Sequence, residues 1–391
     1  MKSRMPQPSA PAVVVGLCSH GLAIVRALAS QGVRVHALEA RPELPGNRTA
    51  LGTVHTVPAI TGPGLIESLI AVRRQIKGTE PPVLFLTNDG MVANVAEAWP
   101  DLQDQYRLSW GASRDEVVAL LAKTEHERHS LATGCHYPAS YTFTSENPTR
   151  ELFNSLAYPV IAKPARPLSS FKTAIARNPD DLARLVHRHA DALPIVAQQF
   201  IPGGEESIHF CAVYLQGGRV VARFDGRKLR SRPMGHTTVA EPATADDVFA
   251  ETQRFFQATG ISGPASLELK RDEHNVLWVI EPTVGRSDFW LQVCISNGVN
   301  LPWIEYCDQA GLEMPAVAAT ASHIWVNTER DPKALGFVLA GMIRNSIRPR
   351  RLVLPYLSSG DPRPVWRATS SKIVRNLSAR SERRRQAASR R

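Results

Sequence analysis

The N-terminal part of the chain alternates short apolar segments with helical patterns, and this alternation restricts the fold more than any other feature. Residues 12–16 form an apolar run that ends in glycine, residues 22–29 have helical apolar spacing, and residues 33–38 form a second apolar run. A further run at residues 83–86 ends in a polar turn. Strands that alternate with helices are typical of an open α/β domain, which we expect over residues 1–110.

The turn after the first predicted strand contains two glycines, Gly16 and Gly21. A dinucleotide fingerprint requires G-x-G-x-x-G, but Leu17 and Cys18 stand where the chain would approach a pyrophosphate. A nicotinamide-dependent oxidoreductase is therefore an alternative supported only by these two glycines. The other interpretation is a Rossmann-like domain that contributes to a substrate site.

The middle of the chain mixes strands and helices less regularly, as an α+β domain does. We expect helices over residues 113–132, 179–189 and 245–259, strands over residues 158–164, 265–270 and 276–281, and further strands and turns within residues 195–239. Helices resume after residue 300, and the organisation weakens after about residue 331. The predicted domains are residues 1–110, residues 111–330 with lobes at 111–200 and 201–330, and a basic extension at 331–391.

The net charge of +10 comes from the C-terminal end. Residues 341–391 contain 14 Lys and Arg but only Asp361 and Glu382, so the rest of the chain has a net charge of −2. Specific nucleic-acid binding by the body of the protein is therefore not expected. Residues 366–380 combine apolar and basic side chains at roughly helical spacing. Such a segment can contact a membrane surface or a polyanion. The alternatives are a disordered end and a helix docked on the body of the protein.

The five cysteines are scattered and form no CxxC pair, which argues against a disulfide framework and a thiolate zinc site. No apolar run is long enough to span a bilayer, and no secretory pattern follows the N-terminus. We expect a cytoplasmic protein, with a peripheral position at the inner membrane surface as an alternative.

Two lysines and two late carboxylates occur in an order that suits a nucleotide triphosphate. Lys123 lies on a predicted helix, Lys163 closes a strand, and Glu268 and Glu281 lie on neighbouring strands. Lysines from different elements can neutralise the phosphates, and paired carboxylates suit Mg²⁺, which also binds phosphate oxygens. An unpaired buried carboxylate at Glu281 would be costly, because apolar residues precede it.

With these residues in place, the sequence resembles the ATP-grasp superfamily, in particular carboxylate–amine ligases of the D-aspartate ligase-like branch. The resemblance covers about residues 12–325. It rests on residues 13–16, 85–89, 123–124, 133–138, 158–164, 198–205, 266–270 and 278–283. It implies a Rossmann-like preATP-grasp domain, then a two-lobed ATP-grasp fold, so the predicted fold class is α/β and α+β.

The resemblance also implies roles for individual residues. ATP phosphates would contact Lys123 and Lys163, adenine would pair with the backbone of a hinge, and the ribose would contact Glu205. The hinge residues are Gln198, Gln199, Phe200 and Ile201; the metal residues are Glu268, Glu281 and Thr283; the catalytic residues are Arg286, Lys228 and Arg230. The implied cofactors are ATP and Mg²⁺, with Mn²⁺ as an alternative metal.

Two departures from the family pattern bear on this assignment. Thr283 stands where the family usually has an asparagine metal ligand, and residues 165–172 contain no glycine where the family often has a Gly-rich lid. The first puts a second metal ion in doubt, and the second limits how freely backbone amides can cradle phosphate.

The resemblance implies an ADP-forming carboxylate–amine ligase that acts through an acyl phosphate, with an amino acid or small carboxylate and an amine as substrates. The alternative is a catalytically altered ATP-binding or regulatory protein recruited to a membrane or surface-polymer assembly. A homodimer is one option for the oligomeric state, which the sequence leaves open.

Overall fold

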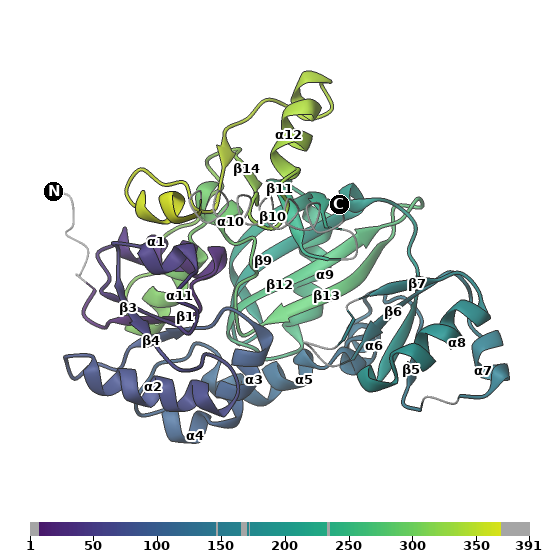
Figure 1. The fold of residues 1–391 in the computed structure, drawn as a ribbon, viewed down its shortest axis with the longest axis horizontal. Coiled ribbons are helices and arrows are strands. Elements are labelled where there is room, and N and C mark those ends of the chain that lie inside the picture. The colour runs from purple at the N-terminus through teal and green to yellow at the C-terminus, as the bar shows by residue number, and fades with distance from the viewer. Residues whose placement is uncertain (1–7, 146–147, 166–169, 172, 233–234, 369–391) are drawn as a thin grey trace, which may run out of the picture.

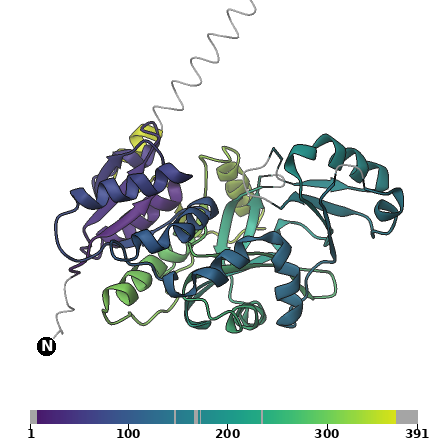
Figure 2. The same ribbon diagram turned by 90° about the horizontal axis from the view of Figure 1, so that it is seen from below.

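The computed structural model describes residues 8–145, 148–165, 170–171, 173–232 and 235–368. Three sheets organise these residues (Figure 1). The N-terminal sheet and the small sheet of residues 140–199 lie at opposite ends of the molecule, with the largest sheet between them (Figure 2). The predicted combination of an α/β domain with an α+β body is confirmed.

The N-terminal domain is an open parallel sheet in the order β3-β2-β1-β4. Its elements are β1 (Ala12–Val15), α1 (Ser19–Ala29), β2 (Val35–Glu39), β3 (Thr53–Thr56), α2 (Pro63–Gln75), β4 (Val83–Phe85), α3 (Asp89–Glu97) and α4 (Trp99–Leu102). All four side chains of β1 are fully buried, as in a strand covered on both faces.

A broken helix follows the first domain. The sequence predicts one helix over residues 113–132, but the structure has α5 (Arg114–Leu121) and α6 (Lys123–Ala132). Ala122 has an extended backbone (φ −85°, ψ 115°), and the buried His126 ring donates from Nε2 to the Leu120 carbonyl at 3.0 Å. The break makes Lys123 the first residue of a helix.

The small lobe is an antiparallel sheet in the order β5-β8-β6-β7. It contains β5 (Ser140–Phe143), α7 (Arg150–Asn154), β6 (Val160–Pro164), β7 (Ala174–Ala176), α8 (Pro179–Arg188) and β8 (Ile195–Gln199). Asn178 caps α8 by accepting a bond from the Asp181 amide at 2.9 Å, and Leu182 and Val186 face the core. The lobe thus has its own core and holds β6 beside β8.

The central sheet has the order β13-β12-β9-β10-β11-β14-β15. Its strands are β9 (Ile208–Gln216), β10 (Arg219–Ser231), β11 (Thr237–Pro242), β12 (Gly263–Arg271), β13 (Leu277–Val284), β14 (Ile324–Val326) and β15 (Leu352–Val353). One face packs against α9 (Asp246–Gln257); the other carries α10 (Gln292–Ser296) and α11 (Leu301–Ala310). Trp290 and Tyr306 share a core with Val14 and Leu28, which joins the central sheet to the N-terminal domain.

The chain after residue 331 is more ordered than the sequence predicted. It contains α12 (Ala334–Ile343), and β15 pairs with β14. Further on, the buried Asp361 accepts bonds from Arg26 Nε at 3.0 Å and from Thr49 Oγ1 at 2.8 Å. The predicted basic amphipathic stretch lies mostly outside the described residues, which end at residue 368.

Candidate functional site

Two carboxylates face each other at the β12–β13 edge of the central sheet. Glu268 and Glu281 are direct register partners on these antiparallel strands. Like charges directly opposite each other destabilise a sheet, so this arrangement requires cations nearby.

Lysines from three other elements supply those cations. Lys228 on β10 reaches across β9, and its Nζ lies 2.6 Å from Glu268 Oε2. Lys123, at the start of α6, places its Nζ 3.6 Å from Glu281 Oε1. Lys163 on β6 donates from Nζ to Gln198 Oε1 on β8 at 3.2 Å. We call these five charged residues the lysine–glutamate cluster.

The members of the cluster change one another's pKa values. Desolvation lowers the pKa of Lys163 to about 8, while Glu281 opposes this shift and Lys123 adds to it. Desolvation would raise the pKa of Glu281, but Lys123 and Lys163 lower it to about 2. Burial lowers the pKa of Lys228, and Glu268 raises it to a net value above the ordinary one. At neutral pH Lys163 and Lys228 are therefore cationic and Glu281 is anionic.

The predicted adenine hinge lies at the end of β8, beside the cluster. The amides of Gln199 and Phe200 already donate to the carbonyls of Ala139 and Pro159, at 2.8 and 3.1 Å. Among the described residues, no hydrogen bond occupies the amide of Ile201. Of the backbone amides at Gln199 to Ile201, this one is available to a base edge.

Glu205 and a lysine that the sequence analysis did not select lie beside this hinge. Lys270 donates from Nζ to the Gly203 carbonyl at 2.8 Å, and its Nζ lies 5.1 Å from the centre of the Phe200 ring. Burial lowers the pKa of Lys270, and Glu205 opposes this shift. Lys270 follows Glu268 by two residues on one strand, so period-two spacing could have indicated that it shares the Glu268 face.

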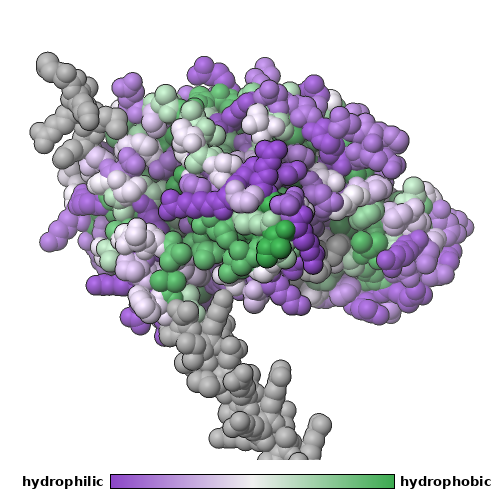
Figure 3. Space-filling view, turned by 90° about the horizontal axis from the view of Figure 1, so that it is seen from above, coloured by the Kyte–Doolittle hydropathy of each residue, from purple (hydrophilic) through white to green (hydrophobic). Residues whose placement is uncertain are grey.

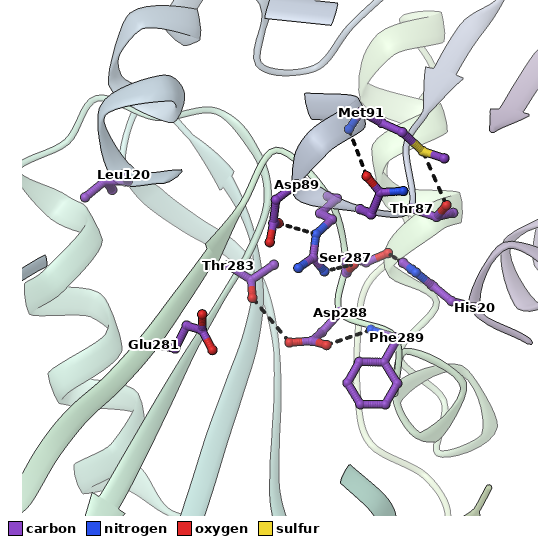
Figure 4. A network of polar contacts seen from close by, with 12 residues as sticks. His20, Thr87, Asp89, Met91, Leu120, Glu281, Thr283, Ser287, Asp288 and Phe289 are labelled. Atoms are coloured by element: carbon purple, nitrogen blue, oxygen red, sulfur yellow. Dashed lines mark hydrogen bonds and ion pairs between the residues drawn. The ribbon is translucent and has the colours of Figure 1, made fainter. Parts of the chain in front are cut away.

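A second polar group lies where the central sheet meets the N-terminal domain (Figure 4). Arg286 donates from Nε to Asp89 Oδ1 at 2.6 Å, which joins the end of β13 to the start of α3. Burial lowers the pKa of Arg286, but Asp89 raises it to a net value above the ordinary one. The predicted catalytic arginine is therefore held by a carboxylate from the first domain.

Thr283 points toward Asp288 and not toward the paired glutamates. Its Oγ1 donates to Asp288 Oδ2 at 3.3 Å, and Asp288 Oδ1 accepts the Phe289 amide at 2.7 Å (Figure 4). Burial raises the pKa of Asp288 to about 6, while Arg286 opposes the shift. Asp288 was not predicted as a site residue. Its position two residues after Arg286 could have indicated that a carboxylate lies beside the predicted catalytic arginine.

His20 lies on the first-domain side of this polar group. Its Nε2 lies 2.9 Å from Ser287 Oγ, and its buried Nδ1 has no partner among the described residues. Burial lowers the pKa of His20 to about 3, and Arg286 adds to that shift. The ring is therefore neutral at physiological pH.

Arg230 lies apart from the lysine–glutamate cluster. Its Nε is 2.6 Å from Asp331 Oδ2, and its guanidinium lies 5.3 Å from the centre of the Phe337 ring on α12. This predicted catalytic residue thus contacts the C-terminal extension.

The turn that suggested a dinucleotide is filled by the protein itself. The Leu17 amide donates to the buried Glu39 Oε2 at 2.7 Å. A side chain at Gly46 would come within 2.1 Å of the Leu17 carbonyl oxygen, and one at Gly21 within 1.8 Å of the Gly16 carbonyl oxygen. This packing leaves the Leu17 amide committed to Glu39.

The paired glutamates fit one divalent cation. Among the described residues, no group of three or more His, Cys, Asp or Glu side chains could hold a metal. Lys228 and Lys123 contact one oxygen of Glu268 and Glu281 respectively, so each carboxylate keeps a second oxygen. Mg²⁺ is commonly held by one or two carboxylates together with substrate phosphates, and this pair suits that arrangement.

Comparisons with solved structures show the fold. The N5-carboxyaminoimidazole synthetase of Staphylococcus aureus, complexed with ADP, has 13% identity and a TM-score of 0.66, covering 87% of this chain and 88% of that one. The biotin carboxylase of Campylobacter jejuni, in a complex with β,γ-ATP, has 12% identity and a TM-score of 0.65, covering 81% and 75%.

The L-amino acid ligase of Bacillus licheniformis has 16% identity and a TM-score of 0.58, covering 79% of this chain and 76% of that one. No protein-family model matches the sequence, and no curated protein matches it. The chain therefore has the ATP-grasp fold that the sequence predicted, while the ligase branch stays a prediction.

Proposed function

We propose that the protein is an ATP-dependent, ADP-forming ligase that joins a carboxylate to an amine. The observation that supports this most is the convergence of the lysine–glutamate cluster, whose members come from α6, β6, β10, β12 and β13. A cluster with three cations and a carboxylate pair suits a magnesium-bound polyphosphate. The similar solved structures include two nucleotide complexes and an L-amino acid ligase, which agrees with this proposal.

In this proposal the nucleotide lies between the small lobe and the central sheet. Lys123 and Lys163 bind phosphate oxygens, the Ile201 amide donates to the base, and Glu205 accepts from the ribose hydroxyls. Gln198 positions Lys163, because its Oε1 accepts the Nζ bond. Gln199 and Phe200 shape the hinge, since their amides are bonded within the protein.

Glu268 and Glu281 would hold Mg²⁺, which when bound neutralises charge on the transferring phosphoryl group. Mn²⁺ is an alternative for the same oxygen ligands. Lys228 bonds Glu268, so it positions that carboxylate and shares its charge. The Thr283 hydroxyl is directed at Asp288, and a role for Thr283 as a metal ligand remains a prediction.

The proposed chemistry has two steps. A carboxylate oxygen of the substrate attacks the γ-phosphorus, the bond to the β,γ-bridging oxygen breaks, and ADP leaves. An amine nitrogen then attacks the acyl carbon, the carbon–oxygen bond to phosphate breaks, and the nitrogen loses a proton. Arg286 follows Glu281 by five residues and would bind the substrate carboxylate or the acyl phosphate, with Asp89 fixing its orientation. Fixed cations stabilise charge that develops in both steps.

The second candidate is a nucleotide-binding regulatory protein without ligase activity. The observation that favours it is the Thr283–Asp288 hydrogen bond, because it directs the hydroxyl of a predicted metal ligand to another side chain. Such a protein would bind ATP and would not consume it with any carboxylate and amine.

The location of the protein, its contacts through the basic tail and its oligomeric state are also proposals. None of the helices that the structure describes is long and apolar enough to cross a membrane. The cytoplasmic location, the contact of the basic tail with a membrane or polyanion, and the homodimer are carried forward from the sequence.

The test is nucleotide turnover by the purified protein with Mg²⁺ and ATP, challenged with pooled amino acids and small carboxylates, with ADP resolved from AMP. We expect ADP and phosphate to appear only with particular pools. Lys163→Ala should reduce the rate about a hundredfold or more, because it removes a cation from the phosphates. Lys77→Ala, which changes an exposed lysine of the first domain, is the matched control and should be unchanged. AMP as product, or full activity in Lys163→Ala, would contradict the proposal.

A further inference from the structure

Helix α12 has an unusual composition for a helix at a protein surface. Its ten residues, Ala334–Ile343, contain no polar or charged side chain. A helix that is apolar all round is normally buried, whereas a surface helix has a polar face. The composition therefore indicates that both sides of α12 contact apolar material.

The described residues pack against one side of α12 and reach the other side only at its margin, where the Arg230 guanidinium lies 5.3 Å from the centre of the Phe337 ring. Ala334, Val338 and Gly341 are buried, and Ile347 packs against Gly341. On the other side Phe337 is 37% exposed, Leu339 46% and Ile343 82%. We call Gly336, Phe337, Leu339 and Ile343 the outer face of α12.

The outer face lies at an end of the molecule where a flat surface can reach it. Helix α12 projects beyond the central sheet (Figure 1). Seen from that side, an apolar area borders hydrophilic side chains (Figure 3). Contiguous exposed apolar surface at a projecting site is typical of an interaction surface.

The charged side chains that flank α12 directly and those of the segment that follows it all have one sign. Residues 332–351 contain five Lys or Arg and no Asp or Glu. Arg350 is paired with Glu241 at 3.0 Å, but in the described parts of the chain no ion pair involves Lys333, Arg344, Arg348 or Arg351. Lys333 and Arg344 flank α12 directly, and all four of these side chains are exposed.

The positive charge distinguishes three partners that could cover the outer face of α12: the C-terminal tail of the same chain, a second copy of the protein, and a lipid surface. The chain's own residues 369–391 contain eight Lys or Arg and one Glu, so they would be repelled. A second copy placed face to face would bring the same cations together, since a two-fold contact uses the same surface on both subunits. An anionic lipid surface offers both a negative charge and an apolar layer.

We propose that the outer face of α12, with its flanking Lys333, Arg344, Arg348 and Arg351, docks onto a membrane surface that contains anionic phospholipid. The apolar side chains enter the boundary between headgroups and acyl chains while the cations contact lipid phosphates. Two weak contributions of this kind together give stable but reversible binding. This inference does not depend on the ligase activity.

The test is sedimentation of the full chain with vesicles of phosphatidylcholine alone and with vesicles that also contain phosphatidylglycerol. We expect binding only to the second kind and a loss of binding as salt is raised, because exposed charges are screened. Leu339→Gln/Ile343→Gln should weaken the partition coefficient about tenfold or more, since both side chains lose their contact with the acyl layer. Val118→Gln, which changes a 43% exposed residue on α5, is the matched control and should bind as the unchanged chain does.

Two further measurements separate the competing occupants. Arg383→Gln/Arg384→Gln/Arg385→Gln removes charge from the tail; if binding depends on this variant and not on the α12 variant, the proposal is overturned. Light scattering gives the oligomeric state of the same samples. A dimer that dissociates in Leu339→Gln/Ile343→Gln would show that α12 contacts protein. Equal binding to both kinds of vesicle, or to neither, would also overturn the proposal.

Discussion

The two ends of the central sheet carry charge in opposite ways. At the β12–β13 end, two carboxylates pair with lysines that reach them from other elements, as in the 2.6 Å contact of Lys228 with Glu268. At the β14–β15 end, Lys333, Arg344, Arg348 and Arg351 surround an apolar helix, and residues 332–351 contain no acidic side chain. In the first arrangement each carboxylate has a lysine partner, whereas in the second these four cations have no ion-pair partner among the described residues.

This difference distinguishes two kinds of anion site. Cations that are partly desolvated and fixed by carboxylates have a defined geometry, which suits a small polyphosphate. Exposed cations beside an apolar face have no fixed partner, which suits an extended anionic surface. Arg230, which contacts both Asp331 and α12 from β10, lies between the two ends.

The largest expected effect is a loss of stability when the ion pair at the β12–β13 end of the central sheet is broken. Lys228 and Glu268 have side chains only 8% and 12% exposed. Removing one member leaves an uncompensated buried charge, so Lys228→Ala should lower the free energy of unfolding by about 3 kcal/mol. Urea titration followed by circular dichroism measures this change.

A double variant separates stability from function at the same pair. Lys228→Met/Glu268→Leu removes both charges and retains apolar volume, so its free energy of unfolding should be close to that of the unchanged chain. Nucleotide turnover should still be lost, because Glu268 is a proposed metal ligand. If Lys228→Ala were as stable as the unchanged chain, the pair would not be buried as the structure indicates.

The next effect concerns the pH dependence of nucleotide affinity. The pKa of Lys163 is lowered to about 8, so this side chain is protonated below that pH and loses its charge above it. The affinity for ADP should therefore fall by about twofold between pH 7 and pH 8 and by about tenfold between pH 7 and pH 9. Calorimetric titration at several pH values measures the decline.

Lys163→Arg is the control for the pH effect. A guanidinium stays charged throughout this range, so the affinity of the variant, whatever its absolute value, should be flat between pH 7 and pH 9. A decline of equal slope in both proteins would assign the titration to another group.

The smallest expected effect is on stability when the outer face of α12, at the β14–β15 end of the central sheet, is made polar. Because Leu339 and Ile343 are exposed, Leu339→Gln/Ile343→Gln should change the free energy of unfolding by no more than about 0.5 kcal/mol. Nucleotide turnover should also be unaffected. A loss above about 2 kcal/mol in the same urea titration would mean that protein covers the outer face and that the contrast between the two ends is wrong.

The sequence predicted those parts of the molecule that repeat a local pattern. Buried strands such as β1 and β4 appear as apolar runs, and the strands carrying Glu268 and Glu281 lie where the sequence predicted them. The ATP-grasp fold followed from the order of these pieces. The pairing of Glu268 with Glu281 and their contacts with Lys228 and Lys123 add geometry that the order alone could not supply.

Other features depend on contacts between distant segments, which a single sequence does not show. The break at Ala122 depends on a side-chain bond from His126 to the backbone, and the Arg286–Asp89 pair joins residues 197 positions apart. Order after residue 331 depends on strand pairing with β14 and on the Asp361–Arg26 contact. The assignment of Arg230 to catalysis used its place in a basic loop, whereas its partner is Asp331.

The most direct test of the central claim is calorimetric titration of the protein with ADP, with and without Mg²⁺, in the unchanged chain and in Lys163→Ala and Glu281→Gln. The account predicts that the unchanged chain binds ADP, that Mg²⁺ strengthens this binding, that Lys163→Ala weakens it about a hundredfold, and that Glu281→Gln removes most of the magnesium effect. Equal ADP affinity in all three proteins, independent of Mg²⁺, would show that the lysine–glutamate cluster is not a nucleotide site.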